Sequence, residues 1–319
     1  MEGQFYAWSP AQAETYALRR AGNVAGAFLV AIMAMRTLIS TLQALGLLSF
    51  LSALATDPVT TSLLDMLLYV VMLVVPVLVV ALITRRRQHR PFYARRVSGG
   101  RWVIALFVGL FFAIFANLVA NWFANFLTQF GVPMPEFPET VQPNVPSLLL
   151  NLLSTAVLPA IFEEMIFRGY ILQTLRPHGD GIAVVVTAAL FGLLHGNILQ
   201  IPFAFILGLI MGYVCVQTEN IWVAVLIHFA NNAMSVLLTF AGVCNPSIEN
   251  AVANAVLIGV AAIGMIAVIA VMMHRGYWRT VTNGISSLSV AARVWCIVST
   301  PFMIVALVLL SVLIGGSLF

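Results

Sequence analysis

The chain has 319 residues, of which 61% are hydrophobic and 8% are charged, and its mean hydropathy is +1.03. A soluble domain would carry about 25% charged residues, and a disordered chain would combine low hydrophobicity with high charge, so both classes are excluded. The net charge of +4 comes from arginines scattered between apolar segments, and the chain has no lysine. This distribution fits the positive-inside rule of membrane proteins and argues against nucleic-acid binding.

The apolar segments have the length of membrane-spanning helices, about 20 residues or more, and not that of barrel strands. They predict an all-α, polytopic integral membrane protein with about eight or nine transmembrane helices. The first segment is too long for one simple span and contains Arg36, which predicts either a tilted helix or an interfacial piece followed by a span. In chain order, the expected helices cover residues 22–53, 59–84, 102–130, 147–176, 182–200, 202–217, 221–241, 252–273 and 294–316.

The arginines between these segments predict the orientation in the membrane. They precede the first expected helix and occupy the second, fourth and eighth loops, whereas three intervening loops contain acids and no arginine. The N-terminus is therefore expected in the cytoplasm and the C-terminus outside. A lysine-free chain without a eukaryotic targeting signal favours the plasma membrane of a bacterium. The arginines are Arg19, Arg20, Arg85, Arg86, Arg87, Arg90, Arg95, Arg96, Arg101, Arg176, Arg275, Arg279 and Arg293, and the acids are Asp57, Glu136, Glu139 and Glu249.

Ionisable residues inside the expected spans are few. Each costs about 2.5–3.5 kcal/mol at a helix centre, so each needs a partner or a function. Asp65 and Arg36 lie on neighbouring helices and are expected to form a structural ion pair. The remaining five fall in three consecutive segments and are Glu163, Glu164, Arg168, His195 and His228.

Helix geometry separates the two glutamates. Glu164 and Arg168 are four residues apart and can pair on one face, while Glu163 points about 100° away. Glu163 and His195 are equally distant from the turn at Gly179, so a helical hairpin would place them at the same depth.

The later span carries a second polar face. His228 and Asn232 share it at four-residue spacing, and Asn231 is the less favoured alternative. His228 is much closer in sequence to its cytoplasmic turn than Glu163 is to Gly179. His228 and Glu163 therefore lie at the same depth in the membrane only if the helical hairpin over 147–200 projects into the cytoplasm.

A carboxylate, two imidazoles and a carboxamide in one cavity are sufficient for hydrolysis of an amide. The carboxylate can take a proton from water, and His or Asn donors can stabilise the oxyanion. The same groups permit a second interpretation, in which Glu163, His195 and His228 hold a zinc ion that retains an open water position. A third interpretation is that these polar groups only lock a helical bundle together.

At these residues the sequence resembles the CAAX protease and bacteriocin-processing family, which includes the type II CAAX prenyl endopeptidases. The family pattern is Glu-Glu-x-x-x-Arg, Phe-x-x-x-His and His-x-x-x-Asn on successive helices, and it occurs here in order between Glu163 and Asn232. The resemblance covers about 146–241, the expected catalytic core. The flanking parts, 1–145 and 242–319, are expected to be N-terminal and C-terminal transmembrane helices.

The resemblance implies a role for each matching residue. Glu163, with His195, would activate the attacking water, and His228 and Asn232 would form the oxyanion site. Glu164 and Arg168 would mainly support the architecture. The family pattern leaves metal dependence open, although the absence of His-Glu-x-x-His favours a site without a tightly bound metal.

Three functions compete at this point. The first is an intramembrane endopeptidase that acts on a peptide or membrane-protein substrate near the cytoplasmic face. The resemblance suggests prenylated CAAX proteins, bacteriocins, pheromone precursors or self-immunity. The second is a noncatalytic scaffold or regulator of the same fold. The third is an ion-coupled transporter, which is disfavoured because the chain shows no internal repeat.

Overall fold

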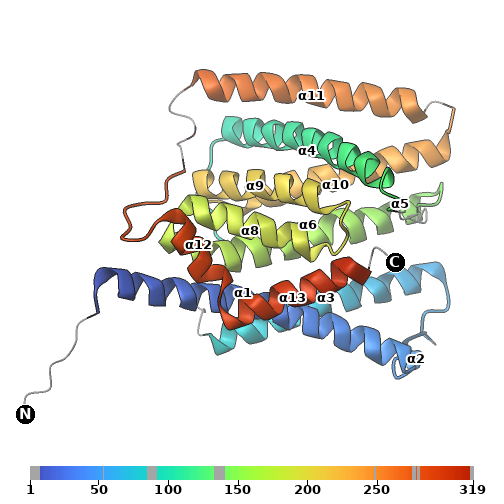
Figure 1. Cartoon of the computed structure of the whole chain (residues 1–319). Helices are drawn as coiled ribbons and strands as arrows, with labels where there is room; N and C mark the ends of the chain where they lie inside the picture. The colour runs from blue at the N-terminus through green and yellow to red at the C-terminus, as the bar shows by residue number, and fades with distance from the viewer. Residues whose placement is uncertain are drawn as a thin grey trace, which may run out of the picture.

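The computed structural model describes residues 8–52, 54–84, 92–132, 141–247, 249–274, 278 and 281–316. Within these ranges every regular element is a helix, and the one β-type pairing is the isolated bridge between Ala94 and Asn220. The predicted all-α class is therefore confirmed. The long helices lie side by side as a bundle, with the beginning of α1 and the end of α13 at opposite ends (Figure 1).

The helices correspond to the expected segments in chain order. They are α1 (Pro10–Ala44), α2 (Ser49–Ser52), α3 (Pro58–Ile83), α4 (Gly99–Thr128), α5 (Val145–Asn151), η2 (Leu152–Val157), α6 (Leu158–Glu164), η3 (Met165–Ile171), α7 (Leu172–Leu175), η4 (Arg176–His178), α8 (Asp180–Leu194), α9 (Ile201–Thr218), α10 (Ile221–Cys244), α11 (Glu249–Met273), α12 (Val290–Val298) and α13 (Pro301–Gly316). Among the described residues, 7 helices are long and apolar enough to cross a membrane, or 8 if α12 and α13, which meet at a bend of 76°, form one span. The remaining expected span is α8, whose 15 residues extend about 22 Å and fall short of a 30 Å hydrocarbon core.

The start of α1 differs from the prediction because a local capping signal outweighs the polar composition of the first residues. Ser9 caps the helix, Gln12 completes a capping box with it, and Pro10 occupies the first turn. The helix is one continuous element of 35 residues, which is longer than a membrane span requires. It ends at Ala44, so the expected extension to residue 53 is wrong.

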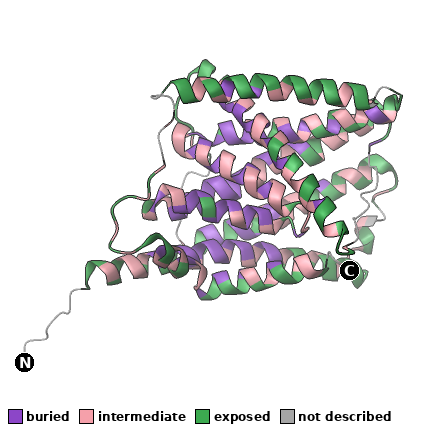
Figure 2. Ribbon diagram, turned by 45° about the horizontal axis from the view of Figure 1, so that its top comes forward, coloured by how far each residue is buried: buried purple, intermediate pink, exposed green. Residues whose placement is uncertain are grey.

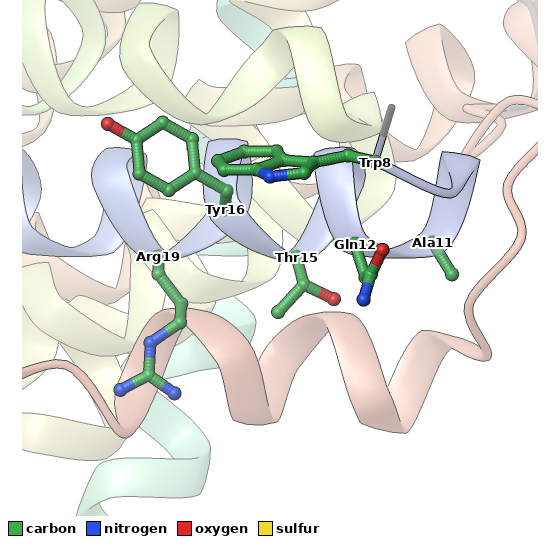
Figure 3. A pocket seen from close by; sticks show the side chains of 6 residues that line it. All are labelled: Trp8, Ala11, Gln12, Thr15, Tyr16 and Arg19. Atoms are coloured by element: carbon green, nitrogen blue, oxygen red, sulfur yellow. The ribbon is translucent and has the colours of Figure 1, made fainter. Parts of the chain in front are cut away.

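An aromatic pair lies at the start of α1 beside a shallow hollow. The rings of Trp8 and Tyr16 lie 5.0 Å apart along the helix (Figure 3). Arg19 and Gln12 also line the hollow, and its described lining includes no acid or histidine. Tryptophan and tyrosine next to arginine are typical of the membrane–water interface, so this segment is suited to anchor the helix there.

The segment 145–178 contains two π-helical stretches, η2 and η3, on either side of α6. A π-helix has more residues per turn than an α-helix, so the chain advances less along the axis for each residue. The η3 stretch therefore shortens the axial distance between Glu164 and the end of the bundle at Arg176. The same end is closed by Arg176, whose Nη2 donates to Glu219 Oε1 at 2.7 Å. π-helical turns are rare and frequently occur at functional sites.

Small residues allow the closest helix contacts. The spacing of Gly208 and Gly212 on α9 predicts close packing, and a Cβ at these positions would lie 3.2 Å from Ala188 and 3.3 Å from Val184 of α8. Buried residues concentrate in the middle of the bundle, whereas α11 is largely exposed on its outside (Figure 2).

Replacing Gly26 with alanine is expected to destabilise the protein by about 1–3 kcal/mol, as overpacking does in other cores. The added Cβ would clash with the backbone N of Met303 and lie 2.7 Å from its Cα, so α1 and α13 would have to separate. The unfolding midpoint in detergent measures this effect. The matched control is Gly259→Ala on α11, which meets nothing within 4 Å and should match or slightly exceed wild-type stability. Equal loss in both variants would contradict the packing argument.

Five of the described arginines lie close together at one end of the bundle. Arg95, Arg96, Arg101 and Arg176 line one cavity of 610 Å³, and Arg293 donates to the carbonyl of His178 at 3.1 Å. This clustering is compatible with the predicted cytoplasmic face, and the orientation stays a prediction. Other residues used for it lie outside the described ranges; they are Arg85, Arg86, Arg87, Arg90, Glu136, Glu139, Arg275 and Arg279.

Candidate active site

Glu163 and His195 line the same small cavity, which has a volume of 150 Å³. Glu163 comes from the end of α6, and His195 caps the C-terminal end of α8. The hydroxyl of Tyr69, on α3, donates a hydrogen bond of 2.8 Å to Glu163 Oε1. One carboxylate oxygen is thereby held in place, while Oε2 remains for another donor.

The end of α8 determines the orientation of the His195 ring. The backbone N–H of His195 donates to Gly192 O at 3.2 Å, and the ring Nδ1 lies 2.9 Å from Phe191 O. A carbonyl oxygen can only accept, so Nδ1 carries the proton in this hydrogen bond. In the neutral imidazole, Nε2 is then an unprotonated acceptor.

A second polar cluster is buried between α6, η3 and α10. Glu164 Oε1 accepts from Arg168 Nη1 at 2.8 Å and from His228 Nδ1 at 2.9 Å. Arg168 Nη2 donates to Gly208 O at 3.1 Å, and the side chains of Glu164 and Arg168 are fully buried. The predicted ion pair between these two residues is therefore present, with His228 as its third member.

The ring of Phe191 connects the cavity with this cluster. The guanidinium carbon of Arg168 lies 4.6 Å from the ring centroid. The imidazoles of His195 and His228 lie 4.9 Å and 6.0 Å from the same centroid, both edge-on. The aromatic residue of the Phe-x-x-x-His motif thus separates the two histidines and packs against both.

Asn232 links α10 to η2. Its Nδ2 donates to Thr155 O at 2.8 Å, and its Oδ1 accepts from Asn231 Nδ2 at 2.9 Å. One of its two amide hydrogens is left for another acceptor. The expected meeting of all four polar groups in one cavity is not seen, because the described lining of the Glu163 cavity includes neither His228 nor Asn232. The two glutamates point to different sides of their helix, and their partners are divided accordingly.

The zinc interpretation is not supported by this geometry. In the described part of the chain, no three His, Cys, Asp or Glu side chains come together as metal ligands. His228 is directed at Glu164 and not at the cavity that Glu163 and His195 share.

The expected ion pair between Arg36 and Asp65 is wrong. No such pair occurs among the described residues, and Asp65 is exposed on α3. Arg36 instead lines the cavity of Glu163 and His195. Tyr69, one turn after Asp65, was also missed. The available signal was a tyrosine hydroxyl within an apolar span, which requires a hydrogen-bond partner.

Replacing Tyr69 with phenylalanine is expected to lower kcat/KM about tenfold or more, because it removes a hydrogen bond to a charged acceptor. The loss should appear mainly in kcat, since the hydroxyl orients Glu163 and is not expected to touch substrate. The control is Tyr170→Phe, whose ring packs 5.3 Å from that of Phe28 and does not line the cavity. Equal activity of the two variants, at equal unfolding midpoints, would remove Tyr69 from the site.

These features describe an all-α polytopic membrane protein that holds a carboxylate and an imidazole in a cavity between its helices. Residues 145–234 match the family model described as Rce1-like, Type II CAAX prenyl endopeptidase Rce1-like. The match confirms the resemblance predicted from the three motifs. It includes Glu163, His195, His228 and Asn232 and covers under a third of the chain. The chain matches no curated protein and no solved structure.

Proposed function

We propose that this protein is an intramembrane endopeptidase that hydrolyses a peptide bond with water activated by Glu163 and His195. The observation that carries the proposal is the shared cavity of these two residues. In it, Tyr69 holds one oxygen of the carboxylate and the Phe191 carbonyl holds Nδ1 of the imidazole. Glu163 Oε2 and His195 Nε2 are left as acceptors, and a water molecule placed between them would donate to both.

The reaction requires two proton transfers. Water attacks the carbonyl carbon of the scissile bond while its proton passes to Glu163 or His195. The resulting tetrahedral intermediate carries a negative oxygen. The same proton then passes to the amide nitrogen, the carbon–nitrogen bond breaks, and a carboxylic acid and an amine leave.

His228 and Asn232 are proposed as the oxyanion donors, and the support for this part is the family match. His228 can donate from Nε2 only when both ring nitrogens are protonated, because Nδ1 is bonded to Glu164. The carboxylate of Glu164 would stabilise such an imidazolium. Asn232 retains one amide hydrogen for the oxyanion.

We propose a peptide or a segment of a membrane protein as the substrate. The matched family description names CAAX prenyl endopeptidases. Processing of prenylated CAAX proteins, bacteriocins or pheromones, or a role in self-immunity, are specific versions of this proposal. The proposed location is the plasma membrane of a bacterium, with the N-terminus in the cytoplasm.

The proposal is tested by mass spectrometry of peptide termini in host membranes that contain either the wild type or Glu163→Gln at matched levels. Asp65→Asn serves as a control, since this exposed membrane acid does not line the cavity. We expect new termini with the wild type and the control, and none with Glu163→Gln. Identical termini in all three membranes, with the variants folded, would favour a noncatalytic scaffold.

A further inference from the structure

Arg36 is an exposed cation on a membrane-length helix, and none of the described residues pairs with it. It lies on α1, eight residues before the helix ends at Ala44. Within the described residues its guanidinium makes no ion pair and no hydrogen bond, and its pairing with Asp65 is not formed. An arginine retains its charge under all relevant conditions, and an unpaired charge on a helix that can cross a membrane is costly.

The position of Arg36 indicates why this cost is retained. Its side chain lines the cavity of Glu163 and His195, where the other lining residues are Tyr69 and the apolar Ile32, Met33, Met72, Leu73 and Leu194. Arg36 is therefore the single cation in the described lining. Glu163 does not neutralise it, because no ion pair joins the two and Glu163 Oε1 is bonded to Tyr69.

We propose that Arg36 binds a carboxylate of the substrate close to the scissile bond and thereby determines which peptides are cut. The proposal rests on the proposed protease function. A guanidinium presents a planar set of donors that matches the two oxygens of a carboxylate. The cavity of 150 Å³ is smaller than a usual drug-sized pocket of about 300–1,000 Å³, so a carboxylate at Arg36 lies within a few residues of the bond at Glu163.

Two sources supply this group, a free C-terminus and an Asp or Glu side chain. Both place a carboxylate against Arg36, and both neutralise the cation only when substrate is bound. A substrate without a carboxylate would leave the charge unpaired. Discrimination against such substrates follows from the cost of covering the guanidinium without giving it an acceptor.

The test begins with the Glu163-dependent cleavage sites found in membranes. A peptide that contains the most abundant site is synthesised with its carboxylates intact. Isosteres of this peptide carry either an amide in place of the C-terminal acid, or Asn or Gln in place of the acidic side chain. Wild type, Arg36→Gln and Arg36→Lys are assayed on both peptides in liposomes. Arg20→Gln, on the same helix and outside this cavity, is the control.

We expect Arg36→Gln to lower kcat/KM for the carboxylate peptide roughly 10- to 150-fold, the loss of one charged hydrogen-bonded pair. The isostere should be cut equally slowly by wild type and Arg36→Gln, and Arg36→Lys should retain part of the preference. The isostere that wild type cuts more slowly than the carboxylate peptide identifies the source of the carboxylate. A slow C-terminal amide indicates a free C-terminus, and a slow Asn or Gln peptide indicates an Asp or Glu side chain.

Three results would overturn the assignment. Equal loss on both peptides would make Arg36 an oxyanion donor or a structural residue. An unchanged rate of Arg36→Gln on the carboxylate peptide would exclude contact between Arg36 and the carboxylate. Equal cutting of both peptides by wild type would exclude selection of substrates by their carboxylate. Absence of any Glu163-dependent cleavage would instead contradict the protease function itself, and the Arg36 assignment with it.

Discussion

The variant Glu163→Gln is expected to lose roughly a hundredfold to ten-thousandfold in kcat, the usual contribution of a general base. Glutamine keeps the shape of the side chain and an oxygen that accepts from Tyr69, but it cannot take a proton from water. The KM should change little, since the substrate contacts are retained. The effect is measured by single-turnover kinetics with a peptide that contains a cleavage site found by mass spectrometry of the membranes.

The control for this prediction is Asp65→Asn, which also removes one membrane acid and should retain wild-type kcat. Unfolding midpoints of both variants should equal that of the wild type within error. If a folded Glu163→Gln enzyme retains more than about a tenth of the wild-type kcat, Glu163 is not the base, because even a weak general base contributes more than this. His195 would then be the remaining acceptor in the cavity.

The variant Arg168→Met is expected to destabilise the protein by about 3–5 kcal/mol, which is the cost of leaving one charge of a buried pair alone. Glu164 would retain only His228 as a partner, in a site with no exposure to solvent. The double variant Glu164→Leu and Arg168→Met removes both charges and should recover most of the stability. The free energy of unfolding in mixed micelles distinguishes the two variants.

A partly exposed cluster of one arginine and two acids provides the matched control. Arg176 pairs with Asp180 and Glu219, and these side chains are 18%, 33% and 42% exposed. Arg176→Met should therefore cost only about 1 kcal/mol. A single Arg168 variant as stable as the double variant would mean that Glu164 is not charged in the folded protein. Such a result would revise the proposed support of His228.

The elements that the sequence predicted well have local signals at their ends. The span expected over 59–84 is α3, because Asp57 caps it and Pro58 begins it. Hydrogen bonds from Thr60 and Val59 also hold the pKa of Asp57 below its usual value. The π-helical stretches and the bend between α12 and α13 were not predicted. They depend on which carbonyl each N–H selects under packing, and apolar periodicity does not encode this choice.

The candidate site was predictable only where its residues lie in the motif-bearing helices. The depth match of Glu163 with His195 follows from the hairpin, and the Glu164–Arg168 pair follows from helix spacing. Tyr69 and Arg36 come from α3 and α1, and their approach depends on how those helices pack against α6 and α8. Sequence distance carries no information on that packing. The same reason explains the wrong pairing of Arg36 with Asp65, which assumed that neighbouring helices in sequence share a facing surface.

The central claim is that Glu163 and His195 activate a water molecule that attacks the peptide bond directly. Its most direct test is a single-turnover cleavage in ¹⁸O-labelled water by the purified protein in liposomes. The substrate is a peptide that contains a Glu163-dependent cleavage site. Direct attack by activated water predicts one ¹⁸O atom in the new C-terminal carboxylate and none in the side chain of Glu163. Glu163→Gln should yield the labelled product at least about a hundredfold more slowly. Label in the Glu163 carboxylate would indicate a covalent intermediate, and absence of cleavage by the purified wild type would contradict the proposed protease function.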